Sequence, residues 1–140
     1  TESAMMSNPA HAVEVLTQLE RMGVKTSIDD FGTGFSSLAY LKQLPVEELK
    51  IDKSFVINMT HDEDDAVIVR STIDLVHNLG LKVVAEGVEN QDILVLLEML
   101  DCDMAQGMFL GTPMATDALE NWFGEHTRQR KKNNVFKIVK

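Results

Sequence analysis

Two apolar patterns alternate along most of the chain, and this alternation restricts the possible folds more strongly than any other sequence feature. One pattern has helical spacing and predicts amphipathic helices, and the other is a short run rich in β-branched residues and predicts strands. We expect helices at 9–22, 36–43, 64–79, 90–100 and 116–123, and strands at 24–28, 47–51, 81–85 and 102–105. Regular alternation of this kind requires parallel strands joined by right-handed crossovers. The sequence therefore predicts an α/β fold with about four parallel βα units, in an open sheet or in part of a barrel.

Composition limits the kind of protein further. The chain has 140 residues and is 44% hydrophobic, which is ordinary for one folded domain and excludes intrinsic disorder for most of the sequence. No apolar run approaches the ~20 residues that a membrane-spanning helix needs. A single cysteine, Cys102, cannot form a disulfide framework, and we expect it to be a small buried residue. We therefore expect a cytoplasmic location. A membrane anchor in preceding sequence of the parent protein is compatible with this expectation.

Charge is distributed unevenly along the chain. The formal net charge is −9, but residues 1–123 hold 21 acidic and 7 basic residues, whereas residues 124–140 hold 6 basic residues and 1 acidic residue. An acidic body repels the phosphates of a nucleic acid, so we expect no binding to duplex nucleic acid. We interpret 124–140 as a basic, solvated C-terminal extension that follows the folded domain of 1–123.

The most informative short segment follows the first predicted strand and reads Asp29-Asp30-Phe31-Gly32-Thr33-Gly34. In an open doubly wound sheet the corresponding turn binds phosphate, but two carboxylates repel a phosphate and suit a metal ion that then binds one. In a barrel, the carboxyl ends of all strands lie at one face, where catalytic residues converge. Polar residues also follow the other predicted strands, and we expect all of them to meet at that face.

Each of these polar residues also has a structural interpretation. Asp29 and Asp30 are candidate metal ligands, or turn and cap residues that accept backbone N–H bonds. Lys50 ends the second predicted strand, where a lysine can also protect an exposed sheet edge. The candidates after the third and fourth strands could equally be loop residues: Glu86, Glu89 and Gln106. Because all of them fall at corresponding ends of successive parallel strands, coincidence is the poorer explanation.

Four motifs follow one another in the sequence: the ten residues from Asp29 to Leu38, then Leu49-Lys50-Ile51-Asp52, then Val84-Ala85-Glu86-Gly87-Val88-Glu89, and finally Gln106-Gly107 with Pro113. In order and spacing they resemble the EAL-type cyclic-di-GMP phosphodiesterases of bacteria, over residues 1 to about 123. The resemblance implies a TIM-like (β/α)₈ barrel, of which this chain is the C-terminal half. It also implies hydrolysis of cyclic di-GMP to linear pGpG in second-messenger signalling, with two Mg²⁺ or Mn²⁺ ions in the complete domain.

The resemblance implies roles for single residues as well. Asp29 and Asp30 match two metal-ligating aspartates, and Lys50 matches a lysine that holds the attacking water or the phosphate. Glu86 matches a glutamate that acts as a general base or as a partner of the second metal ion. Two further residues match positions that support the site and its water: Glu89 and Gln106.

A loop and its anchor complete the resemblance. Thr1-Glu2 matches the end of a Glu-x-Thr-Glu pattern, in which the second glutamate anchors a mobile loop, so Glu2 is the expected anchor. In the family this loop closes over the metal ions and contacts a dimer partner. The residues that match the loop are Gly32, Thr33, Gly34, Phe35 and Ser36.

A complete barrel needs about 250 residues, so the resemblance places the Glu-Ala-Leu signature and a metal-binding asparagine in preceding sequence. We therefore expect the 140-residue chain alone to be inactive, and to form a homodimer or self-associate through its open strand edges. We also expect an upstream regulatory or sensor domain in the parent protein. The alternative is a degenerate domain that binds cyclic di-GMP or a protein partner without catalysis. The presence of Asp29, Lys50 and Glu86 favours the enzyme.

Overall fold

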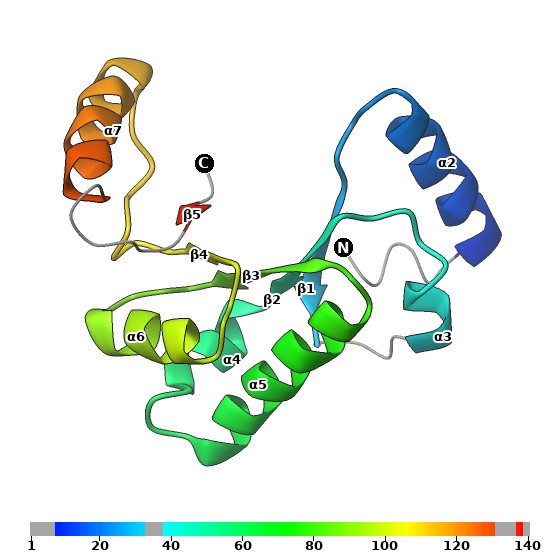
Figure 1. Ribbon diagram of the computed structural model, residues 1–140, viewed down its shortest axis with the longest axis horizontal. Helices are drawn as coiled ribbons and strands as arrows, with labels where there is room; N and C mark the ends of the chain where they lie inside the picture. The colour runs from blue at the N-terminus through cyan, green and yellow to red at the C-terminus, as the bar shows by residue number, and fades with distance from the viewer. Residues whose placement is uncertain (1–7, 33–37, 131–136, 139–140) are drawn as a thin grey trace.

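The computed structural model describes residues 8–32, 38–130 and 137–138. Its helices are α2 (Pro9–Arg21), α3 (Leu38–Leu41), α4 (Lys53–Asn58), α5 (Glu63–Asn78), α6 (Gln91–Met99) and α7 (Thr116–Arg130). Its strands are β1 (Ser27–Phe31), β2 (Glu48–Ile51), β3 (Lys82–Glu86), β4 (Met104–Gln106) and β5 (Lys137–Ile138). The strands form one sheet in the order β1-β2-β3-β4-β5, and all neighbours are parallel (Figure 1). This sequential order is that of consecutive βα units in a barrel and confirms the predicted fold class.

Local sequence signals explain where the longer helices begin and end. Before α2, the Asn8 side chain accepts a hydrogen bond from the His11 N–H at 3.4 Å, and Pro9 takes the first helical position. The Asp62 carboxylate caps α5 in the same way, at 2.9 Å from the Asp64 nitrogen. Each of these helices ends two residues before a glycine with positive φ, Gly23 at 77° and Gly80 at 76°.

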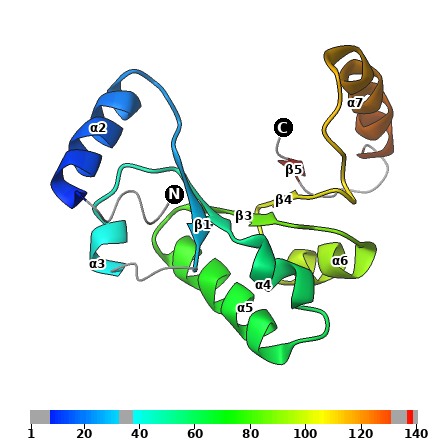
Figure 2. The ribbon, with the colours of Figure 1, turned by 180° about the vertical axis from the view of Figure 1, so that it is seen from behind.

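Helices α4, α5 and α6 cover one face of the sheet (Figures 1 and 2). Alternate strand residues point into this layer, so that Leu49 and Ile51 of β2 and Val83 of β3 are 0% exposed. They form one apolar cluster with helix residues that include Val69, Ile73, Ile93 and Leu97. Because a register shift of one residue would turn these side chains to the other face, their burial fixes the pairing of the strands.

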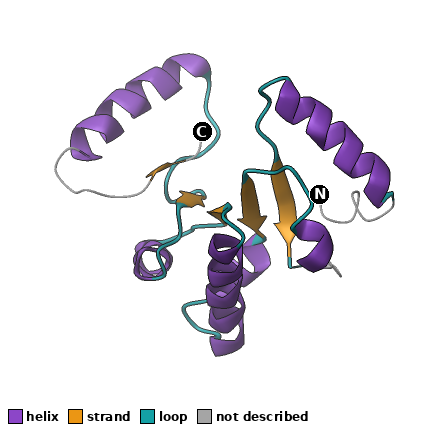
Figure 3. Cartoon of the chain, turned by 45° about the vertical axis from the view of Figure 1, so that its right-hand side comes forward, coloured by secondary structure: helices purple, strands orange, loops and turns teal. Residues whose placement is uncertain are grey.

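The opposite face of the sheet carries the intervening strand residues. On this face Lys50 of β2 lies in register with Val84 of β3, which in turn lies in register with Met104 of β4. Helices α2 and α7 lie apart from the layer of α4, α5 and α6 (Figure 3). In a closed barrel this second face points to the inside, and the carboxyl ends of its strands open onto the site.

The first predicted strand, at 24–28, is wrong in position. Val24 follows α2 and is still bonded to its last turn, because its N–H donates to the Leu19 carbonyl at 3.0 Å. Contact with the neighbouring strand begins at Thr26, whose carbonyl accepts from the Glu47 N–H at 3.1 Å. The strand therefore runs from Ser27 to Phe31 and includes both aspartates of the first motif.

The C-terminal region also differs from the prediction. Helix α7 continues to Arg130, beyond the predicted end at 123, and β5 was not predicted. Strand β5 pairs with β4, with Lys137 opposite Met104 and Ile138 opposite Ala105. The domain boundary at 123 stays a prediction. Among the helices that the structure describes, none combines the length and apolar character needed to cross a membrane.

Candidate metal and phosphate site

Three adjacent strands bring predicted site residues together at their carboxyl ends. Asp29 and Asp30 lie on β1, Lys50 on β2, and Glu86 is the last residue of β3. The nearest carboxylate oxygens of Asp29, Asp30 and Glu86 all lie within 4.8 Å of one another, and each of the three residues is half-buried. Oxygen atoms gathered at this spacing are the donor set that Mg²⁺ or Mn²⁺ prefers.

A bulge in β1 explains how two consecutive aspartates reach the same place. Ile28 pairs with Leu49, but the next pair is Phe31 with Ile51, so β1 contains one residue more than its partner. Asp30 has a φ of 59°, the left-handed conformation, which interrupts the alternation of side chains along the strand. Without this interruption Asp29 and Asp30 would point to opposite faces of the sheet.

Lys50 lies between two of the carboxylates. Its Nζ donates hydrogen bonds to Asp29 Oδ1 at 3.2 Å and to Glu86 Oε1. Burial lowers the pKa of the Lys50 ammonium, but the hydrogen bonds and negative charges of Glu86 and Asp29 outweigh this effect and raise the pKa above its usual value. Since β2 lies between β1 and β3, Lys50 does not protect a sheet edge, and that structural interpretation is wrong.

The segment after β3 is held against the end of β4 by close backbone contact. The Val88 N–H donates to the Gln106 carbonyl, and the Phe109 N–H donates to the Val88 carbonyl, both at 3.1 Å. A Cβ atom at Gly107 would lie 2.2 Å from the Val88 oxygen, so only glycine allows this approach. This contact sets where Glu86 emerges from β3.

The two predicted supporting residues lie at the rim of this segment. Gln106 is exposed and lies in register with Glu86, at the end of the neighbouring strand. Glu89 is also exposed and is not one of the three carboxylates that come together. Their supporting roles stay predictions.

The predicted loop is described only at its first residue. Gly32 has a φ of 101°, and a Cβ atom there would lie 3.0 Å from Phe55 Cε2, so the chain turns directly over α4 at this point. The other loop residues (Thr33, Gly34, Phe35 and Ser36) and the predicted anchor Glu2 lie outside the described residues.

Helix α4 was missed by the sequence analysis, although a signal for it was present. Asp52 follows β2 directly, and its Oδ1 accepts from the Ser54 N–H at 2.9 Å, which caps α4. Hydrogen bonds from Ser54 lower the pKa of the Asp52 carboxyl group. Asp52 therefore lies at the carboxyl end of a strand, as Glu86 does, but its carboxylate caps helix α4.

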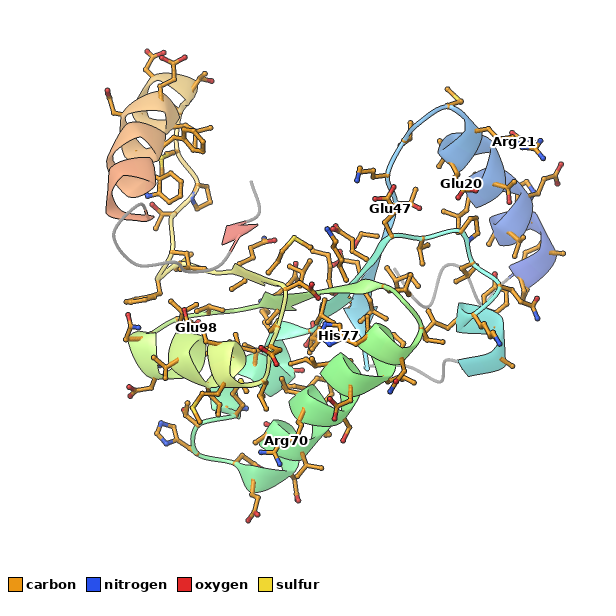
Figure 4. The ribbon with its side chains drawn as sticks, in the orientation of Figure 1. Glu20, Arg21, Glu47, Arg70, His77 and Glu98 are labelled. Atoms are coloured by element: carbon orange, nitrogen blue, oxygen red, sulfur yellow. The ribbon has the colours of Figure 1, made fainter. Side chains whose placement is uncertain are left out.

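At the amino ends of the strands, polar groups form separate pairs. Lys25 Nζ lies 2.6 Å from Glu47 Oε2, in the segment that precedes β2. His77 Nε2, at the end of α5, lies 2.8 Å from Asp103 Oδ2, which also accepts from the Val83 N–H at 3.0 Å. Glu47 and His77 are labelled in Figure 4. Each of these pairs connects two segments of the chain.

A parallel α/β sheet with strands in sequential order, and with carboxylates and a lysine gathered at its carboxyl ends, is typical of part of a (β/α)₈ barrel. The family model for the EAL domain matches residues 1–113. The chain belongs to the EAL domain family.

Comparison with known proteins agrees with this family. The chain is 50% identical over 119 residues to the bifunctional diguanylate cyclase/cyclic di-GMP phosphodiesterase MucR of Pseudomonas aeruginosa. The matched region covers 85% of this chain and 17% of MucR. It is 43% identical over 122 residues to the cyclic di-GMP phosphodiesterase NbdA of the same organism, covering 87% of this chain and 16% of NbdA. The chain thus spans less than a fifth of the length of these relatives.

Solved structures show the same fold. The MucR phosphodiesterase in complex with c-di-GMP superposes with a TM-score of 0.79 at 49% identity, over 82% of this chain and 47% of that chain. The EAL enzyme Bd1971 in its cGMP-bound form gives a TM-score of 0.81 at 40% identity, over 86% of this chain and 32% of that chain. The part of the sheet formed by β1 to β4 therefore belongs to a TIM-barrel EAL domain.

Proposed function

We propose that this chain forms part of a metal-dependent phosphodiesterase that hydrolyses cyclic di-GMP to linear pGpG. The observation that supports this most strongly is the cluster of Asp29, Asp30 and Glu86 with Lys50 at the carboxyl ends of three adjacent strands. Relatives that bear the name cyclic di-GMP phosphodiesterase are up to 50% identical to this chain.

The residues of the cluster fit a divalent cation. Their oxygens converge within 4.8 Å, and the ammonium of Lys50 already occupies a position between Asp29 and Glu86, so the cluster accommodates positive charge. We assign Asp29, Asp30 and Glu86 to Mg²⁺ or Mn²⁺, with two ions in the complete domain. A bound ion would activate water and neutralise the charge of the phosphate.

Lys50 and the rim residues have separate roles in this proposal. Lys50 is protonated near neutral pH, and Glu86 and Asp29 raise its pKa further above the usual value, so its ammonium can hold the attacking water or a phosphate oxygen. Glu86 acts as a general base when it does not ligate metal. Glu89 and Gln106 support the site, and the segment from Gly32 to Ser36, anchored by Glu2, closes over it.

We further propose that the domain acts in the cytoplasm, as a homodimer or self-associated form, under the control of an upstream regulatory or sensor domain. The length of the relatives supports the last point, because the chain spans only 17% of MucR. A buried free thiol at Cys102, whose pKa burial raises to about 11, suits a reducing compartment.

The test uses a joined domain, in which the part of the MucR EAL domain that precedes the matched region is fused before residue 1 of this chain. We expect this joined domain to convert cyclic di-GMP to pGpG in the presence of Mg²⁺ or Mn²⁺, measured by chromatography. Lys50→Met should lower the rate about 100-fold or more, because the group that holds water or phosphate is lost. Residues 1–140 alone should show negligible hydrolysis.

Lys82→Met is the matched control, because Lys82 is an exposed lysine at the other end of the adjacent strand β3. This variant should hydrolyse cyclic di-GMP at the parent rate. A joined domain that binds cyclic di-GMP but does not cleave it with either metal ion would contradict the enzyme and support the non-catalytic receptor instead.

A further inference from the structure

Helix α4 lies against both segments of chain that carry the carboxylates of the candidate metal site. It follows β2, which pairs with β1 on one side and with β3 on the other. Asp29 and Asp30 are on β1, and Glu86 ends β3. The chain leaves these strands through Gly32 and Gly87, and both glycines lie in contact with α4. One short helix therefore touches the chain just beyond all three carboxylates.

On the β1 side, the contact is made by an aromatic ring. A Cβ atom at Gly32 would lie 3.0 Å from Cε2 of Phe55 and 3.7 Å from its Cδ2 and Cζ. Phe55 is half-buried and packs against the apolar core cluster, which fixes the position of its ring. Gly32 has a φ of 101° and comes two residues after Asp30, whose φ is 59°. The ring of Phe55 therefore lies at the turn that ends the bulged segment with both aspartates.

On the β3 side, the approach of the two segments is closer still. A Cβ atom at Gly87 would lie 2.6 Å from Cβ of Lys53 and 3.2 Å from Cγ1 of Ile57. Gly87 has a φ of 79° and directly follows Glu86. A side chain at this position would require a shift of α4 or of the end of β3. The direction in which the chain leaves Glu86 is thus set by α4 as well as by the contact of Val88 with β4.

Helix α4 is anchored independently of these two contacts. The Asp52 carboxylate caps its first turn, at 2.9 Å from the Ser54 nitrogen. On its inner side, Val56 is 0% exposed and the adjoining Met59 is 3% exposed within the core cluster. Side chains in a close-packed core resist displacement. The contacts of α4 therefore give the two turns a fixed support.

The carboxylate cluster needs such a support, because three like charges within 4.8 Å of one another repel. We propose that α4 is a positioning element of the metal site. Phe55 fixes the aspartates of β1 through the turn at Gly32, and Ile57 fixes the end of β3 through the turn at Gly87. Neither side chain has a donor atom for a metal ion, so both act through the carboxylates. This inference rests on the proposed function, because it takes the cluster to be the metal site.

The affinity for Mn²⁺ tests the role of Phe55 without any hydrolysis. Titration of residues 1–140, followed by the electron paramagnetic resonance of the free ion, gives the dissociation constant. Phe55→Ala should raise this constant about tenfold, the typical effect of losing a group that orients metal ligands. Circular dichroism without metal shows which part of each sample is folded.

Leu96→Ala is the matched control, because Leu96 is half-buried and packs against the same core cluster from α6. It should also lower the stability of the metal-free chain, but should leave the Mn²⁺ dissociation constant within about twofold of the parent value. If Phe55→Ala and Leu96→Ala affect the affinity of the folded chain equally, the proposal is wrong.

A conservative pair of substitutions tests the second contact. Ile57→Val keeps a Cγ1 atom, which is the atom of Ile57 that faces Gly87, whereas Ile57→Ala removes it. Ile57→Val should bind Mn²⁺ like the parent, and Ile57→Ala should bind it about tenfold more weakly. Equal affinities of these two variants would overturn the positioning role of Ile57.

A double-mutant cycle separates positioning from a general loosening of the fold. If Phe55 acts through the aspartates of β1, Phe55→Ala should cost only about threefold in affinity when Asp30→Asn is already present. A full tenfold loss in both backgrounds would overturn the proposal. A parent chain that binds no Mn²⁺ would overturn the proposed metal site, and this inference with it. Mn²⁺ binding that is equal in the parent and in Phe55→Ala would overturn this inference alone.

Discussion

The two ends of the parallel strands use charge in different ways. At the amino ends, polar groups pair one to one, Lys25 with Glu47 and His77 with Asp103. At the carboxyl ends, three carboxylates converge within 4.8 Å, and Lys50 bonds two of them. Like charges at this spacing repel one another, so folding stability does not explain the cluster. This difference supports the proposal that the carboxyl ends of the strands bind a ligand, whereas the paired groups at the amino ends stabilise the sheet.

The largest change in the free energy of unfolding is expected at Gly107, where the carboxyl ends of β3 and β4 are in close backbone contact. A Cβ atom at Gly107 would lie 2.2 Å from the oxygen and 2.3 Å from the nitrogen of Val88. Because neither backbone atom can move without separating β3 from β4, we expect Gly107→Ala to lower the free energy of unfolding by about 3 kcal/mol. Urea unfolding followed by circular dichroism measures this change.

Gly124→Ala provides the matched control for a glycine replacement. Gly124 lies within α7, and a Cβ atom there meets nothing within 4 Å. Alanine in a helix should raise the free energy of unfolding by about 0.5 to 1 kcal/mol. A Gly107→Ala variant as stable as the parent would show that the β3–β4 contact does not depend on glycine.

A metal ion should distinguish the carboxyl ends of the strands from the amino ends, because only the carboxyl ends gather three carboxylates. Mn²⁺ at ten times its dissociation constant should stabilise residues 1–140 by about 1.4 kcal/mol, because the ion binds the folded chain. Asp30→Asn should reduce this gain by more than half, since it removes one carboxylate while asparagine tolerates the φ of 59°. Thermal unfolding with and without Mn²⁺, and again after EDTA, measures both effects.

Asp64→Asn is the control for the loss of one negative charge. Asp64 is exposed in the first turn of α5 and lies outside the three-carboxylate cluster. The gain from Mn²⁺ should be the same as in the parent. If Asp30→Asn and Asp64→Asn respond equally to Mn²⁺, the ion does not bind at the carboxyl ends of the strands.

Sequence patterns were sufficient to predict the order of the longer helices and of strands β1 to β4, and the meeting of Asp29, Asp30 and Glu86 at one face. The first long helix was predicted from Asn8, Pro9 and Gly23, and these residues do mark the ends of α2. The meeting of β1 and β3 carboxylates at one face followed from the rule that parallel strands end on the same side. Asp29 and Glu86 could therefore be placed without knowledge of any distance.

Other features depend on tertiary contacts that no local pattern shows. The left-handed Asp30 and the extra residue in β1 accompany its pairing with β2, and an aspartate gives only a weak sequence signal for positive φ. Helix α4 has six residues, which is too short for an apolar period to be recognised. Strand β5 follows a helix that was expected to end at 123, so its partner β4 could not be inferred.

The smallest effect is expected at the amino ends, where one carboxylate joins two chain segments. Asp103 Oδ2 accepts from the Val83 N–H at 3.0 Å and lies 2.8 Å from His77 Nε2. Asp103→Ala removes both contacts, and we expect it to lower the free energy of unfolding by about 1 kcal/mol. Asp74→Ala, an exposed position on α5, should change it by less than about 0.5 kcal/mol.

Asp103→Ala also tests whether the two ends are independent. The gain in stability from Mn²⁺ should equal that of the parent, because Asp103 lies at the start of β4 and the three carboxylates lie at the far ends of β1 and β3. Effects at separated sites without shared partners add in free energy. A Mn²⁺ response that falls together with the stability of Asp103→Ala would mean that the amino-end pairs also hold the cluster in position, and the division between the two ends would then be wrong.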